Sequence, residues 1–362
     1  MTCRRPASLA AWPLIAAVFV GGSTPQPLPA CCAVAREGQH VINSDQAVII
    51  VWDAARKMQH FIRRASFRGG GTDLGFIIPS PTQPDLQEAK DEAFYVLDRL
   101  TTPQDNTTDR SWARKGPQSY AQPPSVRVVE QKQVAGFDAA VLEADSADAL
   151  VQWLEKHDYS YSPAVRDWAK PYVEAKWKFT ALKISKPDEH GHADSVAAKP
   201  LRMSFKTDRP LFPYREPATG VPEEDSTAQS RSKKRTQPAH ARTLTIYFLS
   251  DARYVGQLDG TYPGTTDREE QWGGTVAYAK VIQPNDHRSI VEALGLPQLN
   301  GQAIRWLTKF EDKWPYKLHH ADLVFTKSDD TTSVEPTSHD GLGSIMELIM
   351  DEFKGTSPAL SE

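Results

Sequence analysis

The chain has 362 residues, 40% of them hydrophobic, with 27 prolines against 21 glycines. This length is enough to bury a full core and suggests about two domains, and the many prolines suggest frequent turns and long connections. A formal net charge of -4 excludes the global positive field that would hold a polyanion, so no nucleic-acid partner is expected.

Residues 1–30 predict an export signal. Arg4 and Arg5 form the positively charged n-region of a signal peptide, and the apolar run 9–20 follows as its h-region. The run is short and contains a proline, so it makes a poor membrane span, and an uncleaved anchor is the less favoured alternative. The sequence therefore predicts a protein that is exported to the periplasm or held at the cell envelope by a lipid.

Two adjacent cysteines follow the signal. Leu28-Pro-Ala-Cys31 resembles a bacterial lipobox, and ordinary cleavage after Ala30 is an equal alternative. Adjacent cysteines form at most a strained disulfide that closes no long loop. Cys31 and Cys32 are therefore candidates for lipidation or for pairing with each other, not for stapling the fold.

The first elements are predicted to be strands. Residues 46–52 are apolar and β-branched, residues 58–67 alternate in part, and residues 53–57 join them as a hairpin loop. Gly69-Gly70-Gly71 then precedes a third apolar run, 74–78, so the pattern predicts a three-strand meander. A phosphate cradle would need Lys-Ser/Thr and a helix after the glycines, and a strand-like run follows instead, which favours a turn.

Helix and strand patterns alternate in the middle of the chain. Apolar residues at three- and four-residue spacing predict a helix from Asp85, its N-cap, to Leu100, and Ser146 is predicted to cap a helix containing Trp153. The other elements predicted here are strands at 126–134, 137–142, 176–185 and 201–205 and a helix at 163–174.

Residues 217–241 mark the clearest boundary. They carry charged runs and almost no large apolar side chain, so this segment is predicted to be a disordered linker or insert. It separates an N-terminal α+β domain, 31–216, from a β-rich part, 242–330, which either completes the fold or forms a second domain. In the tail, 331–362, an amphipathic helix is predicted at 344–353, to dock on its own domain or to recruit a partner.

The predicted fold class is therefore α+β, with mainly antiparallel sheets and a few flanking helices. The C-terminal strands predicted for it lie at 244–249, 276–282 and 321–326.

Potential metal ligands concentrate in one segment, 188–194. His190 and His192 would point the same way on an extended chain, as two ligands of a metal site must. The favoured alternative is a polar insert between strands, because short histidine-rich tracts are compositional evidence only. The chain has no His-Glu-x-x-His and no Gly-x-Ser-x-Gly pattern, and other histidines such as His60 are scattered.

Aromatic residues are dense between residues 153 and 177. Trp153, Trp168 and Trp177 lie close together in sequence, and the apolar helical face that contains Trp153 favours core packing. The alternative is an aromatic surface that binds a sugar or a peptide, formed by Trp168, Tyr159, Tyr161 and Tyr172.

Several short sequence segments occur in an order and at a spacing that resemble those of a known family. They are Ala30-Cys31-Cys32, Phe76–Pro81, Gly136–Leu142, Ala149–Leu154, Tyr172–Phe179, Lys199–Phe205 and Leu244–Leu249, with Leu307–Phe310 and Asp322–Phe325 as an extension. Together they resemble the bacterial family called domain of unknown function 2330 (DUF2330), whose members are mostly predicted to be exported. The resemblance implies no agreed activity and no catalytic residues.

The leading prediction is a non-enzymatic binding or structural module of the bacterial envelope, because an export signal is present and no catalytic constellation is coherent. The competing hypothesis is an envelope hydrolase or metal-dependent enzyme, motivated by His190, His192 and the aromatic segment. No cofactor is strongly indicated, and an envelope component or another protein is the expected partner. A deep pocket where titratable groups converge would favour the enzyme, and a smooth surface with an aromatic or apolar patch would favour binding.

Overall fold

The structure is a computed structural model. It describes residues 46–64, 75–102, 127–157, 159, 164–185, 199–215, 217, 243–259, 272–299, 303–313 and 321–336, and the backbone of four short strands at 33–34, 42–43, 66–68 and 195–197. The predicted signal peptide, Gly69 to Gly71, nearly all of the predicted linker and the predicted tail helix lie outside the described residues.

The largest sheet is mostly antiparallel. Its strands, in spatial order, are β16 (Thr275–Val281), β17 (Trp306–Asp312), β14 (Leu244–Ser250), β3 (Gln46–Asp53), β4 (Met58–Arg64), β12 (Leu201–Lys206) and β7 (Asp85–Glu88). Only β14 and β3 pair in parallel among these neighbours, which places a strand from beyond the predicted linker beside the first long strand of the chain.

A second, five-stranded sheet is fully antiparallel. It consists of β1 (Ala33–Val34), β6 (Gly75–Ser80), β10 (Lys178–Ile184), β9 (Phe137–Glu143) and β8 (Arg127–Val134). Two small sheets complete the fold, β13 (Leu211–Phe212) with β18 (Asp322–Lys327) and β15 (Tyr254–Asp259), and β11 (Ser195–Ala197) with β5 (Ser66–Arg68) and β2 (Ile42–Asn43).

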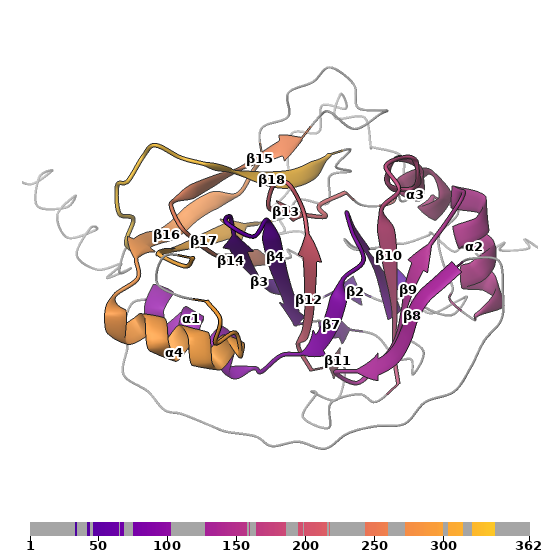
Figure 1. The fold of residues 1–362 in the computed structure, drawn as a ribbon, viewed down its shortest axis with the longest axis horizontal. Helices are drawn as coiled ribbons and strands as arrows, with labels where there is room; N and C mark the ends of the chain where they lie inside the picture. Colours follow the sequence, from indigo (N-terminus) through magenta and orange to yellow (C-terminus); the bar gives the residue numbers. More distant parts are fainter. Residues whose placement is uncertain are drawn as a thin grey trace, which may run out of the picture.

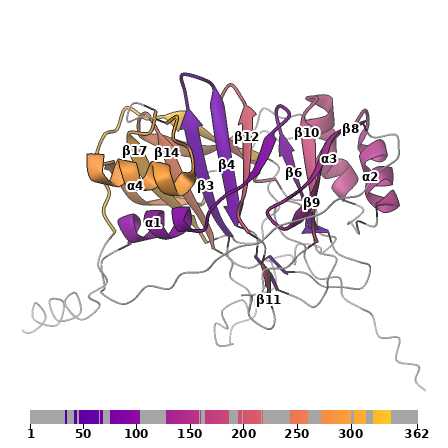
Figure 2. The same ribbon diagram turned by 60° about the horizontal axis from the view of Figure 1, so that its bottom comes forward.

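Helices cover the outer faces of the two large sheets, which gives four layers (Figure 1). The helices α1 (Glu92–Thr101) and α4 (Pro284–Leu294) pack on the seven-stranded sheet, and α2 (Ala147–Lys156) and α3 (Val165–Glu174) pack on the five-stranded sheet. Figure 2 shows the two pairs of helices at opposite ends of this arrangement, with the sheets between them. The α+β class with mainly antiparallel sheets is confirmed.

The main core lies between the sheets. Side chains from both large sheets and from the β13-β18-β15 sheet meet there, among them Phe61, Phe76 and Phe248, each almost completely removed from solvent. Alternation along the central strands of the two large sheets divides their residues between this core and a helix-covered face, so strands such as β3 and β10 are apolar on both sides.

Several local predictions are confirmed. The β3–β4 and β8–β9 hairpins form, and the second one turns through Ala135 and Gly136, whose φ angles of 54° and 82° suit a two-residue hairpin turn. Ser146 caps α2, since its side chain accepts a hydrogen bond from the Ala149 amide at 3.0 Å.

The predicted meander is wrong. β6 is a strand, but it pairs with β10 and β1 in the five-stranded sheet and not with β4. Apolar alternation identifies a strand without choosing its partner, because pairing depends on contacts between distant parts of the chain.

The helix predicted to start at Asp85 is also wrong at its beginning. Residues 85–88 form strand β7, which pairs with β12 and buries Leu86 in the core. Helix α1 begins only at Glu92, after Asp91, whose side chain makes no capping bond. A short strand followed by a helix reproduced the spacing of one longer amphipathic helix.

Within the described residues, no helix combines the length and apolar character that crossing a bilayer requires.

Candidate functional site

A row of three polar side chains lies on the outer face of the seven-stranded sheet. The register places Ser204 of β12 opposite His60 of β4 on one side and opposite Asp85 of β7 on the other. His60 Nδ1 is 2.8 Å from Ser204 Oγ. We call His60, Ser204 and Asp85 the polar row.

The chemistry of the polar row depends on the burial of His60. This side chain is 7% exposed, and burial, together with the nearby positive charge of Arg202, lowers its pKa to about 4. The imidazole is therefore neutral at pH 7 and able to accept the hydroxyl proton of Ser204. Such a pair has the composition of an activated nucleophile and its base, and it also satisfies two polar groups across neighbouring strands.

Arg202 connects the polar row to helix α4. Its Nη1 donates to the carbonyl oxygens of Leu294 at 3.0 Å and Gly295 at 3.2 Å, and its Nη2 donates to Gln87. A guanidinium at this position satisfies the last carbonyls of α4 and complements the negative end of the helix dipole. The end of α4 is thus fixed by a residue of the sheet.

An open hollow runs along the outward side of α4. It has a volume of about 600 Å³ and is lined by Pro284, His287, Arg288, Val291, Glu292, Gly295 and Pro297. The buried side of the helix carries Ile290 and Leu294, so the hollow faces away from the sheet. We call this feature the α4 hollow, and at Gly295 it adjoins the contact with Arg202.

The α4 hollow combines apolar and charged groups. Two prolines and Val291 supply apolar surface, and His287, Arg288 and Glu292 supply an imidazole and charges of both signs. Its volume falls within the range of ligand sites, but neither serine nor cysteine is among its lining residues. This composition fits recognition of a ligand better than covalent catalysis.

A second polar cluster is buried where α3 meets the small β13-β18-β15 sheet. Asp322 is 1% exposed, and its Oδ1 accepts hydrogen bonds from the Tyr172 hydroxyl at 2.8 Å and from the amides of Tyr214 at 3.0 Å and Arg215 at 3.2 Å. Burial raises the pKa of Asp322, against the opposing effect of Arg215.

Tyr214 extends this cluster towards the seven-stranded sheet. Its hydroxyl donates to Asp312, which also accepts a bond from Trp272 Nε1 at 2.9 Å. Both carboxylates are closed to solvent, so these bonds join α3, β17 and β18 and leave no access for a substrate. We interpret the cluster as a structural lock.

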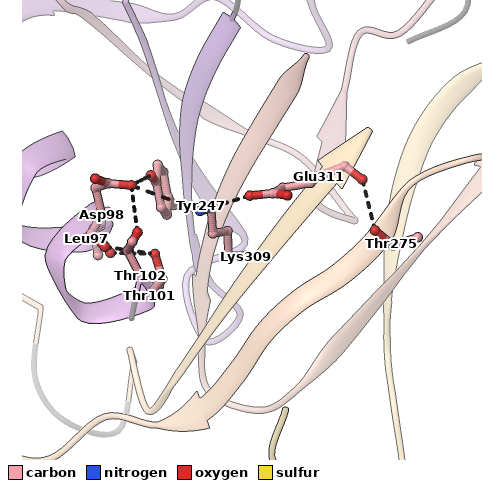
Figure 3. A network of polar contacts seen from close by, with 8 residues as sticks. All are labelled: Leu97, Asp98, Thr101, Thr102, Tyr247, Thr275, Lys309 and Glu311. Carbon is pink, nitrogen blue, oxygen red and sulfur yellow. Dashed lines mark hydrogen bonds and ion pairs between the residues drawn. The ribbon is translucent and has the colours of Figure 1, made fainter. Parts of the chain in front are cut away.

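A third network ties α1 to the sheet (Figure 3). Asp98 of α1 accepts a hydrogen bond from the Tyr247 hydroxyl at 3.1 Å, and Lys309 Nζ lies 4.0 Å from Asp98 and 2.9 Å from Glu311. Burial raises the pKa of Tyr247, so its hydroxyl stays protonated and serves as a donor. This network positions the helix layer.

The metal and cysteine candidates cannot be placed. His190, His192, Cys31 and Cys32 all lie outside the described residues. Within the part of the chain that the structure describes, no group of at least three histidine, cysteine, aspartate or glutamate side chains is arranged to hold a metal.

The aromatic segment belongs to the core. Trp153, Trp168 and Trp177 are all buried in the cluster between the five-stranded sheet and its helices, together with Tyr159 and Tyr172. The core interpretation is confirmed for these residues, and they do not form an aromatic surface. Tyr161 lies outside the described residues.

Sequence reasoning missed the polar row and the α4 hollow. His60 and Ser204 are separated by 144 positions in sequence, and only strand register brings them together. Helix α4 itself carried readable signals, namely Pro284 in its first turn and Gly295 with a φ of 63° just after its end.

A model of the family described as "Uncharacterized protein conserved in bacteria (DUF2330)" matches residues 26–325. The chain belongs to the DUF2330 family. The match spans all the elements that build the polar row and the α4 hollow. No curated protein matches the chain.

A comparison with solved structures finds the crystal structure of baculovirus P35 similar to this DUF2330 protein. The sequence identity is 8%, the TM-score is 0.33, and the alignment covers 83% of this chain and 98% of that one. A similarity at this level supports no statement about function.

Proposed function

We propose that this DUF2330 protein is an exported, non-enzymatic binding module of the bacterial envelope. The observation that carries the binding role is the α4 hollow, an open recess with apolar surface and charges of both signs. Export is supported by the positive start and apolar run of residues 1–30. The family match supports the bacterial setting of the proposal.

The openness of the α4 hollow favours a segment of another protein over a small enclosed substrate. Val291, Arg288 and Glu292 all line the hollow, and the two charged residues are one helical turn apart. A matching segment is expected to place an apolar side chain against Val291 and to offer an acidic group to Arg288 and a basic group to Glu292. The partner we propose is therefore an envelope protein that presents such a segment.

A comparison of matched variants tests this role. Mature protein is used to capture partners from detergent-solubilised envelopes, as wild type, as Val291→Arg in the hollow, and as Tyr95→Ser on α1. Tyr95 is 59% exposed and lies outside the hollow, so its replacement controls for general changes of the surface. The expected result is one envelope protein captured by wild type and Tyr95→Ser and lost with Val291→Arg.

Two results would contradict the binding role. One is the absence of any captured envelope protein, and the other is capture that Val291→Arg leaves unchanged. Equal unfolding temperatures of the three proteins confirm that a lost partner reflects the hollow and not misfolding.

The alternative function is an envelope hydrolase, and one observation favours it. His60 and Ser204 lie within hydrogen-bond distance, and the imidazole is in its neutral form at pH 7. A fluorophosphonate probe tests it, because an activated serine reacts covalently with the reagent. Labelling of wild type that is absent from Ser204→Ala would support the hydrolase, and no labelling above that of Ser204→Ala would exclude a reactive serine there.

A further inference from the structure

Arg63 is buried between the two large sheets, and no polar partner for it is found among the residues that the structure describes. It is 2% exposed, and its guanidinium carbon lies 4.6 Å from the centre of the Phe76 ring. None of its three side-chain nitrogens has a hydrogen-bond partner among the described residues. The aromatic ring stabilises the charge on one face of the guanidinium, but it leaves every N–H donor unsatisfied.

Gln46 is also buried without a side-chain hydrogen-bond partner among the described residues, and it lies on the same face of the seven-stranded sheet as Arg63. It is 4% exposed, and neither its amide nitrogen nor its amide oxygen has a partner among the described residues. Arg63 stands opposite Val48 in the β3–β4 register, and Val48 faces the core between the sheets. Gln46 is two residues before Val48, so its side chain lies on the same face and diagonal to Arg63, within reach of long side chains.

The Arg63 guanidinium and the Gln46 amide are both buried in the same region, and each would be stabilised by a polar partner. Burial of a guanidinium without a counter-charge is strongly unfavourable. The buried carboxylates of the described residues are engaged elsewhere: Asp53 binds Arg56, Asp259 binds Arg209, Asp312 binds Tyr214 and Trp272, and Asp322 binds Tyr172. A group from outside the described residues would give both side chains the partner that these carboxylates do not supply.

We propose that Arg63 and Gln46 form a binding site for a small monocarboxylate that carries a hydroxyl or amino group beside its carboxylate. One guanidinium balances one negative charge, and its fork matches the two oxygens of a carboxylate. The amide nitrogen of Gln46 is a further donor for the ligand, and its amide oxygen needs a donor from it. Phe76 provides the apolar wall.

The chain topology places this site at one end of the core between the sheets. Gln46 begins β3, Arg63 is near the end of β4, and β6 begins at Gly75, one residue before Phe76. The short strands β2 and β5 directly precede β3 and follow β4, so the small sheet lies at this same end, below the large sheets in Figure 2. The site is separate from the α4 hollow, which is on the opposite side of the seven-stranded sheet.

Thermal unfolding of the full mature chain tests the site with lactate, glycine, acetate and phosphate as probes, against equal concentrations of chloride. Lactate and glycine are expected to raise the unfolding temperature of wild type most, acetate less, and phosphate no more than chloride. Arg63→Met, which keeps the length of the side chain and removes the charge, is expected to respond to none of them. Gln46→Leu is expected to respond to acetate as strongly as to lactate, and it provides an independent test if Arg63→Met does not fold.

Three results would overturn the proposal. The first is that no carboxylate raises the unfolding temperature of wild type above its value in chloride. The second is that the probes raise the unfolding temperature of wild type and of Arg63→Met equally. The third is that phosphate raises the unfolding temperature of wild type as much as lactate does. Asp45→Asn and Asp73→Asn are made alongside, because both carboxylates lie close in sequence to β3 and β6 and outside the described residues. If the probes do not change the unfolding temperature of wild type and one of these variants is strongly destabilised, the partner of Arg63 belongs to the chain itself.

Discussion

At the scale of single residues, His60 shows how the fold changes the properties of a side chain. Its imidazole is enclosed by the sheet, bonded to Ser204 and close to the charge of Arg202. Burial opposes protonation, so the neutral form is favoured in the folded state far below the pH at which a free histidine gains its proton.

This difference predicts a pH-dependent loss of stability. The pKa of His60 is about 4 in the folded protein, against the 6.5 of an unperturbed histidine, so the unfolded chain binds more protons between these limits. The free energy of unfolding is therefore expected to fall as the pH drops from 6.5 towards 4, with a contribution from His60 of up to about 3 kcal/mol. Urea unfolding at a series of pH values measures it.

Two variants isolate the contribution of His60 from that of the carboxylates. His60→Gln removes the titrating group and is expected to flatten the pH dependence in this window. Ser204→Ala keeps the imidazole buried and is expected to retain most of the wild-type slope. A His60→Gln protein with the same slope as wild type would show that this imidazole is not the group responsible.

At the scale of elements, helices and strands are held by residues from distant parts of the chain. Arg202 of β12 binds the last carbonyls of α4, and Asp98 of α1 binds Tyr247 of β14. Each contact fixes the end or the side of a helix against the sheet. The position of the α4 hollow therefore depends on β12 as well as on α4.

Strand β15 has a position where a side chain is excluded by close packing. A Cβ added at Gly256 would lie 2.5 Å from the buried ring of Trp272, whose Nε1 is bonded to Asp312. Gly256→Ala is expected to displace the ring and to lower the free energy of unfolding by about 1–3 kcal/mol, as overpacking does in other cores. Denaturant unfolding measures the loss.

Gly273 provides the matched control for this prediction. A Cβ added there would meet its nearest neighbour, Asp312 Oδ1, at 3.7 Å, which is an ordinary contact. Gly273→Ala is expected to be much less destabilising than Gly256→Ala. Equal losses for the two variants would argue against close contact with Trp272 as the cause.

At the scale of the whole molecule, the two large sheets enclose the main core, and helices cover their outer faces. The two proposed binding sites lie on opposite sides of the seven-stranded sheet. The α4 hollow lies outside the helix layer, whereas Arg63 and Gln46 lie between the sheets. Binding at the two places is therefore separable, since Val291→Arg changes the outer surface and Arg63→Met changes the interior.

The proposed export predicts how the mature chain begins. Lipobox cleavage and ordinary cleavage after Ala30 both remove residues 1–30 and leave Cys31 first. Intact mass measured on the protein from periplasmic and membrane fractions is expected to show this start, with the added mass of a lipid if the lipobox is used. Cys31→Ala is expected to abolish lipid attachment while leaving the fold unchanged. A full-length chain confined to the cytoplasm would contradict export.

The sequence by itself determined the family, the α+β class and most strands between Gln46 and Lys206. These features depend on alternation, turn residues and caps, all of which are local. Ser146 illustrates this, since its cap involves only the next three residues. The local signals failed at Asp85, where a strand and a helix follow each other with one continuous apolar spacing.

Only the tertiary structure decided which strands pair and which side chains meet. It set β6 in a different sheet from β4, placed β14 beside β3, joined His60 to Ser204 and left Arg63 buried without a partner among the described residues. The physical reason is that register and burial follow from the packing of segments that are distant in sequence. A pattern read along one strand shows which residues share a face, but not what that face contacts.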